Sequence, residues 1–155
     1  MATKTSTRAK SAPDARSEGE VYILDGQVGF LLRLAQQRHA GIFASRMLEG
    51  LTPTQWAALA KLREIGPSSQ NSLGRLTAMD AATIKGVIDR LTKRGFTRTK
   101  PDPADGRRLL VALTAQGAAL YERVAPVATR ITEETLAPLD ERERADLLLL
   151  LAKLG

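Results

Sequence analysis

The side chains best suited to bind another molecule are basic, and most of them fall in one short segment. Residues 85–108 hold eight Lys or Arg residues and three Asp, a net charge of +5 in a 155-residue chain whose total is +6. Residues 1–17 hold four basic residues and one Asp, so the rest of the chain is slightly acidic. Surfaces that bind polyanions have such a concentration of positive charge. Charge alone is as consistent with a solvated polar face.

Chemistry that makes or breaks bonds has little material in this chain, which contains no cysteine and one histidine, His39. The lack of thiols excludes disulfides, thiolate metal sites and cysteine nucleophiles. One imidazole is too few for a zinc site or a Ser-His-Asp centre within one protomer. No glycine-rich phosphate loop is present either. We therefore expect neither enzymatic activity nor a metal or cofactor.

The sequence also lacks the marks of a membrane or secreted protein. No stretch approaches the roughly 20 apolar residues that are needed to cross a bilayer. The first residues are basic but lack the apolar core of a secretory signal. We therefore expect a cytoplasmic protein with no membrane partner.

Helices must position the basic segment, and their start and stop signals are clear. Thr52, Pro53 and Gln55 can form a capping box, and Gly66-Pro67 ends the helix that follows. Apolar periodicity and further capping residues extend the prediction to six helices. Their approximate ranges are 24–47, 53–65, 70–76, 81–94, 115–136 and a last helix from 141 that contains the leucine run 147–151.

Residues 96–113 change from helical to strand-like periodicity. Residues 96–100 and 108–113 predict two strands, joined by the turn-rich residues 101–106. The order short helix, tight turn, helix and basic hairpin is that of a winged helix-turn-helix, in which the second helix enters the major groove of DNA. The predicted fold is thus mainly α, of the α+β kind, with long helices at both ends.

The second helix of this unit is expected to bury one apolar stripe and expose an unusual face. Ala82 and Gly86 stand on the exposed face, where large polar residues are common. A glycine inside a helix costs about 1 kcal/mol relative to alanine, and close approach to a DNA groove is a reason to accept that cost. The alternative is that Gly86 is a tolerated weak point or packs against another helix. The expected buried stripe is Ile84, Val87, Ile88 and Leu91.

Candidate DNA contacts follow from this placement. Thr83 and Lys85 are candidates for base edges or phosphates, and Arg90 and Lys93 for phosphates. The first residues of the preceding helix can donate to a phosphate at its N-terminus. These are Ser69, Gln70 and Asn71.

The hairpin and its flanks resemble the MarR family of transcriptional regulators. Residues 102–108 (DPADGRR), followed by 113–117 (LTAQG), look like the wing signature of that family, D-P-x-D-x-R and then L-T-x-x-G. The helix 81–95 is similar to the family's recognition helix, and the resemblance covers about residues 21–153. Within the family, the chain is most similar to repressors of aromatic-acid catabolism of the nicotinate-degradation type.

The resemblance implies a homodimer that represses transcription by binding a palindromic operator in double-stranded DNA. The DNA-binding lobe would span about 52–113, and the dimerisation helices about 21–48 and 114–155. These parts make residues 20–155 one winged-helix regulator domain, and the composition of residues 1–19 predicts a disordered basic arm. The apolar last helix agrees with a dimer, although an intramolecular core is the alternative.

The wing signature also implies residue roles. Arg107 matches the arginine that enters the minor groove, and Asp105 matches the acidic residue that orients it. Arg108 is an additional basic residue and completes the predicted DNA-binding set.

The resemblance further implies a pocket for a small aromatic carboxylic acid, with 6-hydroxynicotinate as one candidate. An arginine or a protonated histidine would pair with the carboxylate, while aromatic side chains would contact the ring. For His39 and Trp56, a structural role in the core or an interface is the alternative. The candidate ligand-binding residues are Arg38, His39, Phe43, Arg46 and Trp56.

One competing interpretation stays open at this point. The basic arm and the modest aromatic content also suit an architectural, weakly specific DNA-binding protein that has no effector. Affinity for a scrambled palindrome distinguishes the two.

Overall fold

The computed structural model describes residues 21–155, so the predicted arm, residues 1–19, lies outside the described residues. Six α-helices, two 3₁₀ turns and one antiparallel hairpin follow one another along the described part. In chain order they are η1 (Leu24–Gly26), α1 (Val28–Arg46), η2 (Leu48–Gly50), α2 (Pro53–Ile65), α3 (Gln70–Leu76), α4 (Ala81–Lys93), β1 (Thr97–Pro101), β2 (Leu109–Leu113), α5 (Ala115–Thr135) and α6 (Glu141–Ala152). This is the predicted winged helix-turn-helix, flanked by long helices.

The predicted caps hold the helix starts. Both hydrogen bonds of the capping box form at Thr52, and Asp140 makes the same arrangement at the start of α6. Asp80 and Thr114 each accept a hydrogen bond from the third residue of the helix that follows. These local bonds satisfy backbone donors that the helix itself leaves free, which is why the sequence predicted these starts closely.

The first helix begins later than its apolar periodicity predicts. The expected range was 24–47, but η1 ends at Gly26 and Gln27 is extended, so α1 starts at Val28. A Cβ atom on Gly26 would meet nothing within 4 Å, so packing does not require a glycine there. The N-cap residue Gln27 makes no side-chain capping hydrogen bond to α1. A glycine at this point weakens helix propagation, and periodicity does not register that local cost.

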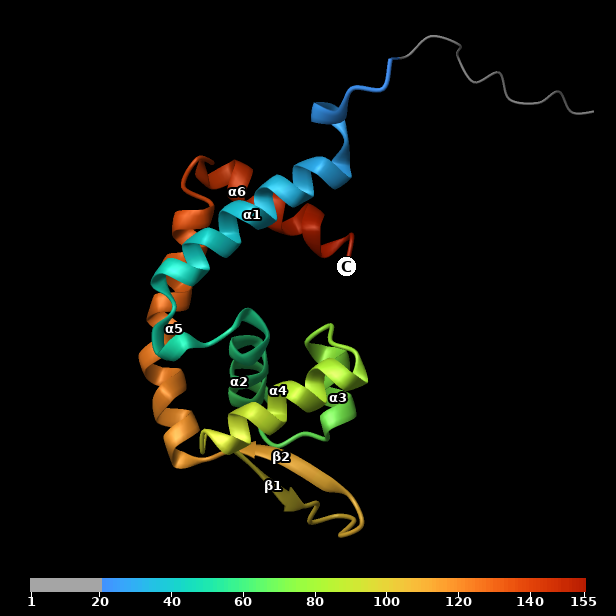
Figure 1. The fold of residues 1–155 in the computed structure, drawn as a ribbon, viewed down its shortest axis with the longest axis vertical. Coiled ribbons are helices and arrows are strands. Elements are labelled where there is room, and N and C mark those ends of the chain that lie inside the picture. Colours follow the sequence, from blue (N-terminus) through green and yellow to red (C-terminus); the bar gives the residue numbers. More distant parts are fainter. Residues whose placement is uncertain (1–20) are drawn as a thin grey trace, which may run out of the picture.

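The compact core lies in the lobe formed by α2, α3, α4 and the hairpin, against the first half of α5 (Figure 1). The expected stripe of α4 is buried at 4% exposure or less. By contrast, α1 buries only Phe43, and α6 buries no residue. The helix α5 runs from the hairpin to the region where α1 and α6 cross, and so connects the two parts (Figure 1).

The hairpin is tied to the lobe on both sides. Its strands pair antiparallel with Thr97 opposite Leu113 and Pro101 opposite Leu109. On the other side of β2, Ser68 and Val111 exchange two backbone hydrogen bonds. This bridge, which the sequence analysis did not predict, fixes the start of α3 relative to the wing.

Candidate nucleic-acid interface and ligand cavity

The exposed face of α4 is small at its centre and charged along its sides. A Cβ atom on Gly86 would meet only the guanidinium group of Arg90, with 3.3 Å to its nearest nitrogen. Gly86 is therefore not required by packing against another helix, which was one alternative. Lys85 forms an ion pair with Asp89 at 2.8 Å, and both side chains are largely exposed. Such a pair is weak in water and can be exchanged for a phosphate.

The N-terminus of α4 is held by Asp80. Its carboxylate accepts hydrogen bonds from the backbone N–H of Thr83 at 2.7 Å and from the Thr83 hydroxyl at 3.0 Å. These hydrogen bonds favour the charged carboxylate and lower the pKa of Asp80 below its usual value. The Thr83 hydroxyl hydrogen is thus engaged, which leaves the hydroxyl oxygen as an acceptor and the methyl group to contact a base.

At the start of α3, Ser69 is the N-cap residue. Its hydroxyl oxygen accepts a hydrogen bond from the backbone N–H of Ser72, which leaves the hydroxyl hydrogen available to a phosphate. Asn71 is exposed and Gln70 is half-buried. The three residues lie together at one helix end, as their sequence positions required.

Two aspartates shape the tip of the wing. The Asp102 carboxylate accepts from the backbone N–H of Ala104 at 2.9 Å, and that of Asp105 accepts from the backbone N–H of Arg107 at 3.1 Å. Both are local turns of the kind that Asp favours. Asp105 therefore holds the main chain at Arg107, and no side-chain ion pair joins the two within residues 21–155.

The L-T-A-Q-G run fastens the wing to α5. The Thr114 hydroxyl donates to the carbonyl oxygen of Gly95 at 2.6 Å and accepts from the backbone N–H of Gly117. The backbone N–H of Thr114 donates to the carbonyl oxygen of Phe96. A Cβ atom on Gly117 would overlap that same carbonyl, so only glycine fits there.

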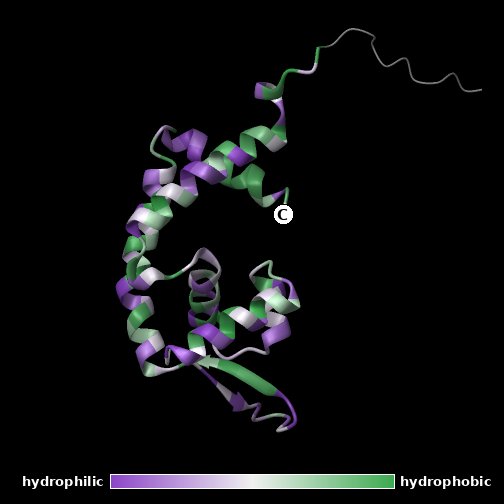
Figure 2. Cartoon of the chain, in the orientation of Figure 1, coloured by the Kyte–Doolittle hydropathy of each residue, from purple (hydrophilic) through white to green (hydrophobic). Residues whose placement is uncertain are grey.

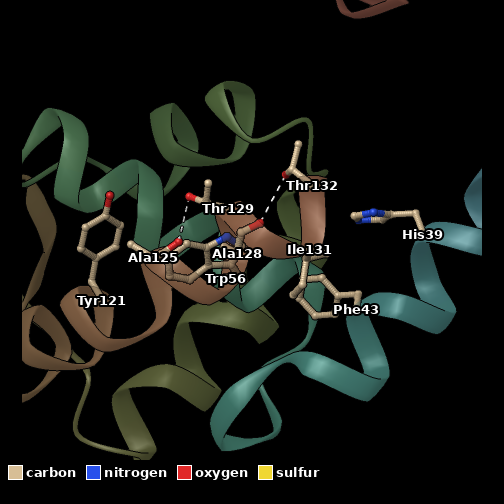
Figure 3. Close-up of a pocket in the computed structure, with 9 residues that line it drawn as sticks. All are labelled: His39, Phe43, Trp56, Tyr121, Ala125, Ala128, Thr129, Ile131 and Thr132. Atoms are coloured by element: carbon tan, nitrogen blue, oxygen red, sulfur yellow. Dashed lines mark hydrogen bonds between the residues drawn. The ribbon is translucent and has the colours of Figure 1, made fainter. Parts of the chain in front are cut away.

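A cavity of about 410 Å³ lies between α1, α2 and α5 (Figure 3). Its volume suits a ligand with one aromatic ring. Trp56 of α2 stacks on Tyr121 of α5 with 5.4 Å between ring centres and 13° between planes. Phe43 and His39 of α1 approach from the other side with their ring centres 6.0 Å apart. The remaining lining residues come from α5: Ala125, Ala128, Thr129, Ile131 and Thr132.

Three of the five predicted ligand residues thus line one cavity: His39, Phe43 and Trp56. The two arginines lie elsewhere. Arg38 donates to the backbone carbonyl oxygens of Glu134 and Thr135, at the C-terminal end of α5. Arg46 binds the carboxylate of Glu134 at 3.0 Å, and this partner raises the pKa of Arg46 above its usual value. Both arginines hold α5 against α1 and do not line this cavity.

Sequence reasoning missed the α5 side of the cavity. Tyr121, Thr129 and Thr132 line it, whereas all predicted ligand residues lie between Arg38 and Trp56. The signal was present, because these positions share one face of a helix with Ala125 and Ala128. Only the packing of α5 across α1 and α2 brings that face to Trp56.

The described residues meet the requirements of neither a metal site nor a membrane-spanning helix. Within residues 21–155, no group of three or more His, Asp or Glu residues could hold a metal ion. Among the helices that the structure describes, none has the length and apolarity to span a membrane.

Known proteins with similar sequences and folds are regulators of transcription. The chain is 42% identical to the HTH-type transcriptional repressor NicR of Pseudomonas putida over 149 residues, which cover 96% of this chain and 92% of NicR. A probable transcriptional regulator from Pseudomonas aeruginosa is 56% identical, with a TM-score of 0.83 over 86% of this chain and all of that chain.

BpsR of Bordetella bronchiseptica, whose DNA binding is regulated by 6-hydroxynicotinic acid, has a similar fold. It is 41% identical, with a TM-score of 0.83 over 87% of this chain and 97% of that chain. In addition, residues 51–109 match the MarR family itself. The winged fold, the wing signature and these relatives agree, and the chain belongs to the MarR family of transcriptional regulators, which are not enzymes.

Proposed function

We propose that this protein is a ligand-responsive repressor. A homodimer binds a palindromic operator through α4 and the wing, and a small aromatic acid releases it. The observation that carries the DNA-binding part is the exposed face of α4, where packing does not require Gly86 and where Lys85, Arg90 and Lys93 surround it. A face with a small centre and basic sides suits a helix that lies deep in a major groove.

The dimer is proposed because two long helices lack a core of their own. The side chains of Leu148, Leu149, Leu150 and Leu151 are 41% to 58% exposed in the protomer. Four apolar side chains near the start of α1 are also exposed: Val28, Leu31, Leu32 and Leu34. Figure 2 shows hydrophobic colouring along parts of α1 and at the C-terminal end of α6, away from the hairpin. An apolar surface of this extent is typical of a permanent interface with a second copy.

The cavity between α1, α2 and α5 is the proposed effector site. It joins both parts of the protomer, since α1 and α5 belong to the dimerisation region and Trp56 to the DNA-binding lobe. A ligand that binds one arrangement of these helices better than another shifts the population toward it and changes the spacing of the two α4 helices. The likeness to NicR and BpsR makes 6-hydroxynicotinate the first compound to test.

A binding assay tests the proposal. Duplexes selected from a random pool would supply the palindrome, and fluorescence anisotropy would compare it with a scrambled duplex at physiological salt. We expect about a thousandfold preference for the palindrome and a 5- to 150-fold loss of affinity, roughly, on addition of 6-hydroxynicotinate. Equal affinity for both duplexes would favour the architectural alternative. If no aromatic acid changed the affinity for the palindrome, the effector part of the proposal would be wrong.

A further inference from the structure

Three threonines on one side of α5 use their hydroxyl hydrogens within the helix. Thr129 donates to the carbonyl oxygen of Ala125 and Thr132 to that of Ala128, as the dashed lines in Figure 3 mark. Thr135 donates to the carbonyl oxygen of Ile131 at 2.7 Å. A hydroxyl has one hydrogen and two lone pairs, so each of these oxygens is left as an acceptor.

This assignment gives a direction to the hydrogen bond between Thr135 and His39. The Thr135 oxygen lies 3.0 Å from Nδ1 of His39. The contact from the Thr135 hydroxyl to the Ile131 carbonyl oxygen is the shorter of the two, so we assign the hydroxyl hydrogen to it, and Nδ1 of His39 then carries a hydrogen and donates it. In a neutral imidazole the other nitrogen, Nε2, then has no hydrogen and can only accept. His39 extends from α1 toward the cavity (Figure 3).

The cavity therefore has a polar wall made of acceptors. Nε2 of His39 and the hydroxyl oxygens of Thr129 and Thr132 form it, and no Lys or Arg is among the described residues that line the cavity. The donors of the lining are the indole N–H of Trp56 and the hydroxyl of Tyr121. A carboxylate is repelled by acceptors and attracted by donors, which points it toward the Trp56 end.

We propose that the cavity recognises its ligand through a hydrogen-bond donor of the ligand, a ring hydroxyl or ring N–H directed at Nε2 of His39, and that Thr135 is the positioning residue that enforces this choice. This reverses the role first expected of His39, which was to pair with the ligand's carboxylate. The inference rests on the proposed function in that the ligand is taken to be a small aromatic acid.

A ligand series tests the choice of donor. Isothermal titration calorimetry would compare 6-hydroxynicotinate, which has a donor in either tautomer, with 6-methoxynicotinate, whose methyl group removes it. We expect the methoxy compound to bind the wild-type protein at least about tenfold more weakly. Equal affinity for the two compounds would overturn the inference.

Variants at Thr135 separate positioning from simple structure. Thr135→Val keeps the shape but removes the acceptor for Nδ1, and we expect the preference for the hydroxy compound to shrink to about threefold or less. Thr135→Ser keeps the oxygen and serves as the matched control, with the preference retained. A full preference in Thr135→Val would contradict the assigned role.

The tautomer can also be measured without any ligand. His39 is the only histidine in the chain, so its two ring nitrogens are identified in a ¹⁵N-correlated NMR spectrum without further variants. At about pH 8.5, where imidazole is neutral, we expect hydrogen on Nδ1 and none on Nε2. The opposite tautomer would overturn the inference. If neither compound binds, the proposed effector fails, and the spectrum alone still decides the polarity of the wall.

Discussion

Only glycine fits at position 117, because neighbouring backbone atoms leave no room for a side chain. Its backbone N–H caps α5 through Thr114, and its missing side chain makes room for the carbonyl oxygen of Phe96. The glycine therefore permits close packing between α5 and the residue that leads into β1. This close contact explains why the position needs a glycine.

Gly117→Ala tests this explanation. We expect it to lower the free energy of unfolding by about 3 kcal/mol, because the added carbon must displace backbone atoms. Chemical denaturation would measure the change. Gly106→Ala is the matched control, since a Cβ atom there meets nothing within 4 Å and its stability should change little. A similar small change in both variants would contradict the packing argument.

Arg107 is exposed at the wing tip, and only its backbone is held, by Asp105. Arg107→Ala should weaken binding to the selected palindrome by about tenfold or more, because a minor-groove arginine contributes both charge and fit. The assay is fluorescence anisotropy, with the dimer checked by light scattering. Arg142→Ala on α6 is the control, and wild-type affinity in Arg107→Ala would refute the wing assignment.

The helix α4 shows how one element meets two demands. Its apolar stripe is fully used by the core, while its exposed face carries Gly86, which weakens the helix without any gain in packing. Natural helices tolerate such a local cost where function needs it. The stability of the free protein and its affinity for DNA should therefore respond to Gly86 in opposite directions.

Gly86→Leu makes this opposition measurable. Leucine is a strong helix former, so we expect the free energy of unfolding to stay the same or rise by up to about 1 kcal/mol. The melting temperature should stay the same or rise accordingly. The larger side chain should hold the helix away from the groove and reduce operator affinity by about tenfold or more. Unchanged affinity would mean that this face of α4 does not approach the bases.

The start of α4 should depend on pH through Asp80. Its pKa is lowered in the folded state, so its contribution to stability is complete above the ordinary aspartate value of about 3.9 and is lost as the pH falls through the lower folded value. Melting temperatures of wild type and Asp80→Asn, compared between about pH 6 and about pH 2.5, test this. The asparagine keeps an acceptor, so wild type should lose its advantage in acid. A constant difference would contradict the assignment.

At the scale of the whole molecule, the protomer has two parts, and only one of them has a well-buried apolar core. The DNA-binding lobe has its own core, whereas α6 buries none of its residues against the rest of the chain. Arg38 and Arg46 keep α1 and α5 together, but those contacts are polar and largely exposed. The proposed partner subunit would supply the missing apolar contact.

Leu148→Glu tests the proposed dimer. A charge at this position should disrupt an apolar interface and leave a folded monomer, since Leu148 is 53% exposed and belongs to no buried cluster. Light scattering would measure the mass, and affinity for the palindrome should fall by about 100-fold or more when one half-site is lost. Arg142→Ala is the control on the same helix. A stable wild-type dimer in Leu148→Glu would place the interface elsewhere.

The sequence by itself determined the elements and the winged helix-turn-helix that they form. Caps, turn residues and apolar stripes act over a few residues, so the helix starts, the wing and the recognition helix could be placed from local patterns. Only the tertiary structure decided the cavity. Tyr121 and Thr132 lie far from His39 along the chain, and the packing of α5 brings all three into one cavity. The same packing places the Thr135 hydroxyl 3.0 Å from Nδ1 of His39. Hydrogen bonds to α5 hold the side chains of Arg38 and Arg46, and another joins His39 to Thr135. The spacing of residues along the chain does not predict these bonds.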